Sequence, residues 1–155
     1  MQFIDSDFEF PISSAVVHDG RVFEAVVTGI PDDERQPVPG GAGAEMREIF
    51  RQLDTFLAAA NVDRFAVCTA RLYQQEVLVD LAAVNVAWKR TGREGTARAG
   101  EELAHPAVPK RVRCARVNQK EYFGEHPVVR RAYGVQLQAG MRVEAAFAAE
   151  LGPAA

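Results

Sequence analysis

The sequence feature that most constrains the fold is an amphipathic pattern in residues 44–61, AEMREIFRQLDTFLAAAN. Apolar residues recur there at spacings of three and four, which gathers them into one stripe along a helix while charged residues face away. The stripe comprises Met46, Ile49, Phe50, Leu53, Phe56, Leu57 and Ala60. A helix with one apolar face needs a second element to cover it. The segment therefore predicts a helix that lies on a sheet and ends near Asn61.

Strand patterns on both sides of this helix indicate what the sheet contains. Residues 13–29, SSAVVHDGRVFEAVVTG, hold two β-branched runs separated by Asp19-Gly20, a pair that tolerates the positive φ angles of a two-residue hairpin turn. Residues 64–73 have the β-rich composition and the length of one strand. Residues 126–151 alternate well enough to predict two further strands around a tight turn.

A second helix is predicted between these strands. Asp80 opens or interrupts a helical stretch in which one face is shared by Leu78, Leu81, Val84 and Trp88. The elements then follow the order strand, strand, helix, strand, helix, strand, strand. This order predicts an α+β domain with a mostly antiparallel sheet and both helices packed on one face.

Composition places the chain among ordinary globular proteins. Its 155 residues, 48% hydrophobic and 25% charged, are most simply one domain spanning 1–155. A net charge of -3 argues against a general nucleic-acid binder. Cys68 and Cys114 lack the spacing of a zinc site or a disulfide framework, so we expect reduced thiols and no metal. The N-terminus lacks a secretion signal, and no run reaches the roughly 18 apolar residues of a membrane helix, which predicts a cytoplasmic protein.

The pattern breaks down in residues 91–120, which we interpret as a basic insertion within the domain. The segment holds seven basic and three acidic residues, an excess of four positive charges. A segment of this length inside a compact domain is seldom only a connector. Two interpretations stay open, namely a solvated insertion with a short helix around residues 100–104, or a basic lid or docking surface.

The last two predicted strands carry three charges among apolar residues, Arg130, Arg131 and Glu144. Side chains alternate along a strand, so Arg130 and Arg131 are expected on opposite faces, with Arg131 solvated or at an interface. A guanidinium holds a carboxylate through a planar fork of donors, and a neighbouring carboxylate can relay a proton. Arg130 and Glu144 are therefore candidates for a small-carboxylate site. The structural alternative is an Arg–Glu pair across two adjacent strands.

Four blocks of the sequence, taken in order, resemble the successive blocks of the RidA/YjgF family, also labelled endoribonuclease L-PSP. The blocks are PISSAVVHDGRVFEAVVTGIP, EMREIFRQLDTFLAAAN, ARLYQQEVLVDLAAVNVAW and EYFGEHPVVRRAYGVQLQAGMRVEAAFAAEL. The resemblance covers most of the chain except 91–120, which looks like an insertion within or just after the second helix. It implies a chorismate-mutase-like fold and a homotrimer with ligand clefts between subunits. The activity it implies is hydrolysis of reactive enamines and imines of 2-amino acids to 2-oxo acids and ammonia, without metal or cofactor.

The family's motifs point to particular residues of this sequence. The motif Pro-x-x-Arg followed shortly by Gly-Val, seen here as PVVRRAYGV, places the anchor of the substrate carboxylate at Arg130. The Val-Glu pair near the end of the last strand places the family's glutamate at Glu144. The Val-Asn pair of the second helix places its asparagine at Asn85. The small hydroxyl residue before a strand-ending glycine falls on Thr28, followed by Gly29.

Two positions depart from the family pattern. Ile12 stands where many members have an aromatic residue just after the first proline, and Ile30 stands where they have glutamine. With Ile12 among the substrate-lining residues, both changes indicate a more apolar pocket and a bulkier or aromatic-derived acid.

Three functions remain open at this point. The first is the deaminase that the resemblance implies. The second is a small-carboxylate binding or sensor module of the same fold, in which Arg130 anchors a ligand without turnover. The third, an RNA-binding protein or ribonuclease, is the least favoured because residues 91–120 lack aromatic residues interleaved with the basic ones.

Overall fold

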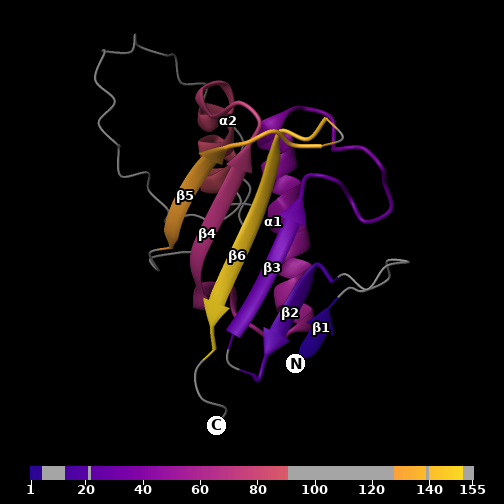
Figure 1. Ribbon diagram of the computed structural model, residues 1–155, viewed down its shortest axis with the longest axis vertical. Coiled ribbons are helices and arrows are strands. Elements are labelled where there is room, and N and C mark those ends of the chain that lie inside the picture. The colour runs from indigo at the N-terminus through magenta and orange to yellow at the C-terminus, as the bar shows by residue number, and fades with distance from the viewer. Residues whose placement is uncertain (5–12, 21, 91–127, 139, 152–155) are drawn as a thin grey trace, which may run out of the picture.

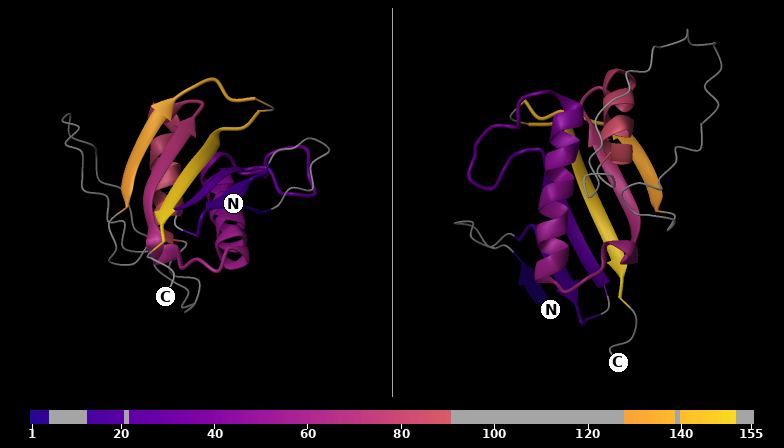
Figure 2. Two further views of the ribbon diagram at one scale, coloured as in Figure 1. Left: turned by 60° about the horizontal axis from the view of Figure 1, so that its bottom comes forward. Right: turned by 180° about the vertical axis from the view of Figure 1, so that it is seen from behind.

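The computed structural model describes residues 1–4, 13–20, 22–90, 128–138 and 140–151. The strands are β1 (Gln2–Ile4), β2 (Ala15–His18), β3 (Val22–Thr28), β4 (Val67–Gln74), β5 (Val129–Gly134) and β6 (Val143–Glu150). The helices are α1 (Ala42–Ala59) and α2 (Val77–Arg90), with one 3₁₀ turn, η1 (Arg64–Ala66), before β4. The strands form one sheet in the order β1-β2-β3-β6-β4-β5, and both helices lie on one face of it (Figure 1, Figure 2). We call the other face the open face.

The predicted fold class is confirmed. All described strand pairs are antiparallel except β4 with β5, which run parallel. Two strands that follow one another along the chain run parallel only if a crossover connects them, and α2 follows β4 on that path. Residues 91–127, which contain the predicted basic insertion, lie outside the described residues.

Helix α1 supplies the centre of the core, as its stripe predicts. Met46, Ile49, Phe50 and Leu53 are fully buried against the sheet side of the helix. The ring of Phe50 lies edge-on to Trp88 of α2 at 5.2 Å between centroids. The helix begins after Gly41, which has φ 72°, and the chain leaves it at Asn61, which has φ 55°. A positive φ is common just beyond the C-terminus of a helix, so the predicted end near Asn61 is confirmed.

The first hairpin and its turn at Asp19-Gly20 are confirmed, but His18 lies opposite Val22, so three residues separate the paired positions instead of the predicted two. Asp19 has φ 49° and Gly20 has φ 66°, positive values that the Asp-Gly pair tolerates. The strand β1, which continues the sheet beyond β2, was not predicted. Its three residues are too few to show alternation.

The predicted hairpin over residues 126–151 is wrong. β5 and β6 are not neighbours, because β4 lies between them and pairs with both. Strand β6 takes the centre because Val143, Ala145, Phe147 and Ala149 make one side of it fully apolar. Strand β5 bears two arginines and is exposed along most of its length, features that are tolerated at an edge.

The predicted apolar face of α2 is partly wrong. Val84 and Trp88 are buried, but Leu78 is 95% exposed. Leu78 belongs to the first turn of the helix and Asp80 takes the buried position there, accepting hydrogen bonds from the Arg142 side chain. Among the described helices, none is long and apolar enough to span a membrane.

Candidate functional site

Arg130 points from the edge strand β5 toward helix α2. Its Nη2 donates a hydrogen bond of 2.6 Å to Oδ1 of Asn85, and its Cζ lies 4.8 Å from the ring centroid of Trp88. The guanidinium is thus held by an amide on one side and an aromatic face on the other. Burial lowers the pKa of Arg130 from its ordinary value. A guanidinium keeps its charge despite such a shift, so α2 places a fixed, partly desolvated cation at this edge.

One donor group of Arg130 has no partner among the described residues. Its Nη1 is buried and makes no hydrogen bond there. An unsatisfied buried donor is costly, and more so when it is charged. A carboxylate oxygen placed there would satisfy it with a charge-assisted bond. The prediction that Arg130 and Asn85 act at one place is therefore consistent with the geometry, because the two side chains contact each other directly.

Glu144 lies on the open face, away from Arg130. On β6 the even-numbered residues alternate with the buried core residues, and Glu144 is half-buried opposite Thr28 of β3 and Tyr73 of β4. The alternative of a cross-strand pair between Arg130 and Glu144 is wrong, because β4 separates their strands and the sheet separates their side chains. Within one chain the predicted anchor and the predicted proton relay do not meet.

The open face also confirms the predicted alternation of the two arginines. Arg131 is exposed and is the partner of Arg71 in the ladder, while Arg130 is turned toward α2.

A hollow of about 420 Å³ adjoins Glu144 where strands β4 and β6 meet the loop before β6. It is lined by Tyr73, Val135, Gln136, Leu137, Gln138, Met141 and Glu144. Polar groups make up much of its surface, so the hollow does not show the more apolar pocket that Ile12 and Ile30 predict, and Ile12 itself lies outside the described residues. Tyr73, which also stacks on Tyr133 at 5.7 Å, was not predicted as a site residue. Its position opposite Glu144 in the sheet is what identifies Tyr73 as a candidate site residue.

Thr28 and Gly29 have different surroundings at the end of β3. Thr28 ends β3 opposite Glu144, and its Oγ1 accepts a hydrogen bond from the backbone of Ile30 at 3.3 Å. Gly29 is buried where α1 passes close to the strand end, and a Cβ on it would lie 2.5 Å from Cβ of Glu45. Gly29 is therefore required for packing. Thr28 has the position of a group that could contact a ligand beside Glu144.

No cluster of three metal-ligating side chains occurs among the residues that the structure describes. Among the described residues, the groups of the predicted site that are available for chemistry include the Arg130 guanidinium, the Glu144 carboxylate, the Tyr73 phenol, the Thr28 hydroxyl and side-chain amides. These groups can bind a carboxylate and transfer a proton.

Comparison with known proteins identifies the fold. No family model matches the sequence, and no curated protein matches it. Among solved structures, a candidate endoribonuclease of Thermotoga maritima is 17% identical, with a TM-score of 0.68 and 97% of each chain covered. The chain has the fold of the YjgF and Rid proteins. The YjgF gene product of Escherichia coli is 14% identical, with a TM-score of 0.64 over 92% of this chain and 90% of that one. YyfA of Yersinia pestis, a Rid-family protein of unknown function, is 16% identical, with a TM-score of 0.63 over 90% and 87%.

Proposed function

We propose that the protein hydrolyses reactive enamines or imines derived from 2-amino acids, releasing a 2-oxo acid and ammonia without a cofactor. The observation that carries the proposal is the buried Nη1 of Arg130, which has no hydrogen-bond partner among the described residues. A 2-imino acid carries a carboxylate, which can accept a hydrogen bond from this donor. The Rid-like fold adds support, and Glu144 at the border of a hollow supplies a carboxylate able to move protons.

The reaction needs few groups from the protein. Arg130 holds the substrate carboxylate, which fixes the position of the adjacent imine carbon. As the oxygen of a water molecule bonds to that carbon, Glu144 takes one proton from the water and passes it to the imine nitrogen, which gives a carbinolamine. Glu144 then takes the proton of the new hydroxyl group and passes it to the amino nitrogen, so that the carbon–nitrogen bond breaks and ammonia leaves as the carbonyl forms. An enamine enters the same path once a proton reaches its carbon and converts it to the imine.

The proposed site is completed by a second copy of the chain, because Arg130 and Glu144 lie on opposite faces of one sheet. Val129 and Tyr133 of β5 and Val86 of α2 are exposed large residues at the edge near Arg130. In a homotrimer, this edge of one subunit would meet the open face of the next and form a cleft with both groups.

Light scattering tests the assembly. We expect a mass three times the 17.0 kDa of one chain. A monomeric mass at micromolar concentration would contradict the trimer. Glu144 would then have no Arg130 from a second subunit beside it.

Imine decay tests the activity. An amino-acid oxidase generates 2-imino acids in solution, where they also decay slowly without catalysis. We expect added protein to accelerate the decay in proportion to its concentration, with the largest effect on imines of bulky apolar amino acids because of Ile12 and Ile30. Decay at the uncatalysed rate across a panel of such imines would exclude the proposed activity.

A binding module without turnover is the second candidate. The separation of Arg130 from Glu144 within one chain favours it, since Arg130 can anchor a carboxylate without a proton relay. Saturable binding of a 2-oxo acid, lost in Arg130→Ala, together with uncatalysed imine decay would select this candidate.

A further inference from the structure

The open face carries charged side chains that the proposed assembly would cover. Glu24 of β3 and Arg131 of β5 are both exposed on this face of the single chain. Neither side chain forms a hydrogen bond or an ion pair with another described residue. A charge that leaves water without a partner of opposite sign costs free energy. If a second copy covers the open face, these two groups therefore need partners from that copy.

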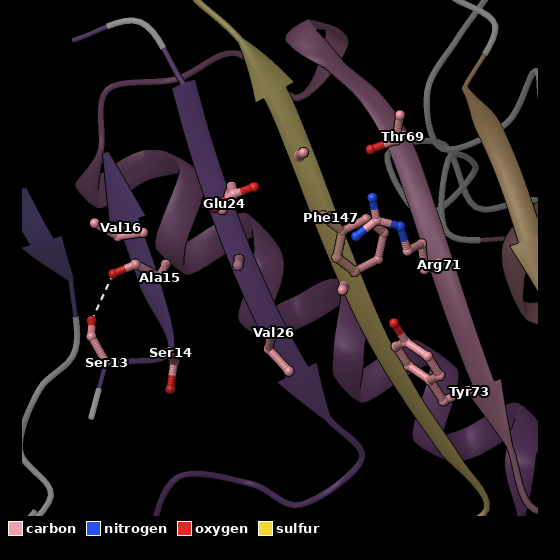
Figure 3. A pocket seen from close by; sticks show the side chains of 13 residues that line it. Ser13, Ser14, Ala15, Val16, Glu24, Val26, Thr69, Arg71, Tyr73 and Phe147 are labelled. Carbon is pink, nitrogen blue, oxygen red and sulfur yellow. Dashed lines mark hydrogen bonds between the residues drawn. The ribbon is translucent and has the colours of Figure 1, made fainter. Parts of the chain in front are cut away.

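Glu24 borders a hollow of about 360 Å³ on the open face. Figure 3 shows Glu24 on β3 and Arg71 on β4 at opposite sides of this hollow, with the Arg71 guanidinium extending over β6. Ala146 and Ala148 of β6 lie between them, and their small side chains leave space. Arg71 and Glu24 form no ion pair with each other. The Glu24 carboxylate is thus available to a cation that enters from outside the chain.

The edge strand β5 carries such a cation between two apolar residues. Val129, Arg131 and Tyr133 alternate with Arg130, which is turned toward α2, so these three side chains are on the open side of the sheet. Val129 and Tyr133 are among the exposed large residues of the chain, and so is Val26, which lines the hollow. A contact between this edge and the hollow would bury apolar area and bring Arg131 to a carboxylate.

The spacing of the charges on the two surfaces agrees with this contact. Arg130 and Arg131 leave β5 on opposite sides, which separates their guanidinium groups by roughly 12 to 14 Å when both side chains are extended. On the open face, Glu144 is opposite Thr28, which is four residues from Glu24 along β3. Four residues of a strand span about 13 Å. The edge that brings Arg130 to Glu144 therefore has its second arginine at the distance of Glu24.

We propose that Arg131 of one subunit pairs with Glu24 of its neighbour, and that this ion pair sets the register in which the β5 edge covers the open face. The proposal rests on the assembly proposed above, in which the same edge brings Arg130 to Glu144. Glu24 then has a guanidinium on either side, one from the neighbour and one, across the hollow, from Arg71 of its own chain. In another register a covered charge would lack its partner, so the pair selects one alignment of the two subunits.

Charge reversal tests the pair, with the mass of the full chain measured by light scattering over a range of protein concentrations. Glu24→Arg and Arg131→Glu each bring like charges together. Each change is expected to raise the concentration at which half of the trimer dissociates by about 100-fold. The double variant with both changes restores opposite charges, and its half-dissociation concentration is expected to return to within about 10-fold of the wild-type value.

Glu150→Arg is the matched control for these variants. Glu150 is also an exposed carboxylate, but it ends β6, six residues from Glu144. Six residues of a strand span about 20 Å, which is farther than Arg131 reaches when Arg130 is at Glu144. Glu150→Arg is therefore expected to assemble as the wild type does.

Circular dichroism separates dissociation from unfolding. Glu24 and Arg131 are exposed in the single chain, so the dissociated variants are expected to keep the wild-type spectrum. Wild-type assembly of Glu24→Arg would overturn the pairing and leave the trimer in place. Dissociation of both single variants without recovery in the double variant would overturn it as well. Dissociation of Glu150→Arg, with Glu24→Arg intact, would assign the carboxylate to Glu150 and a different register.

The wild-type measurements separate this pairing from the proposed activity. A single-chain mass for the wild type would overturn the assembly and the pairing together. A trimeric wild type without imine hydrolysis would overturn the proposed activity alone, since the masses of the variants still test the pairing.

Discussion

Replacing Arg130 by alanine is expected to remove about 2 to 5 kcal/mol of transition-state stabilisation from imine hydrolysis, measured as a loss in kcat/KM. The reason is that the substrate carboxylate loses a cation that α2 has already oriented and partly desolvated. Such an anchor is stronger than one in water because the surrounding dielectric is lower. Arg130→Lys is expected to recover little activity, since an ammonium cannot reproduce the fork that contacts Asn85 and a carboxylate together.

Two further variants serve as comparisons for Arg130→Ala. Glu144→Gln is expected to leave the affinity for a 2-oxo acid close to that of the wild type while lowering kcat, because an amide cannot accept the proton. Arg47→Ala removes an arginine from the outer side of α1 and is expected to leave both constants unchanged. If Arg130→Ala retained wild-type kcat/KM with a normal melting temperature, the anchor would have to be another cation.

The elements that sequence could predict are those whose information is local. Six of the seven apolar positions of the stripe lie within α1, with Ala60 just after it, and Asp19-Gly20 has a backbone preference of its own, so the helix and the hairpin are confirmed. The opposite orientation of Arg130 and Arg131 follows from the alternation of any strand. Each of these inferences needs only residues within a few positions of one another.

Local sequence patterns could not predict the strand order or the separation of Arg130 from Glu144. Alternation in residues 126–151 shows that strands exist but does not determine which strand pairs with which. The insertion of β4 between β5 and β6 is what separates Arg130 from Glu144. Gly29 illustrates the same limit, because its requirement arises from a helix residue, Glu45, that is 16 positions away in sequence and adjacent only in the fold.

Glu45 is a buried residue whose structural role cannot be seen in the sequence pattern. In the sequence it is an ordinary charge near the start of an amphipathic helix, yet its side chain is only 2% exposed. Its Oε2 accepts hydrogen bonds from the backbone N–H groups of Arg142, at 2.7 Å, and Val143, at 2.9 Å. The carboxylate thereby joins the first turn of α1 to the start of β6, the strand that carries Glu144.

Glu45→Ala is accordingly expected to lower the free energy of unfolding by about 3 to 5 kcal/mol, since two N–H groups lose a charged acceptor and at least one of them is left buried. Glu45→Gln is expected to recover at least half of that loss, because its amide oxygen can occupy the position of Oε2. Chemical denaturation at one fixed protein concentration measures both, with Arg47→Ala on the same helix as the control for a change at an exposed site. A loss for Glu45→Ala within about 0.5 kcal/mol of the control would mean that water replaces the carboxylate, and the junction between α1 and β6 would then depend on apolar packing alone.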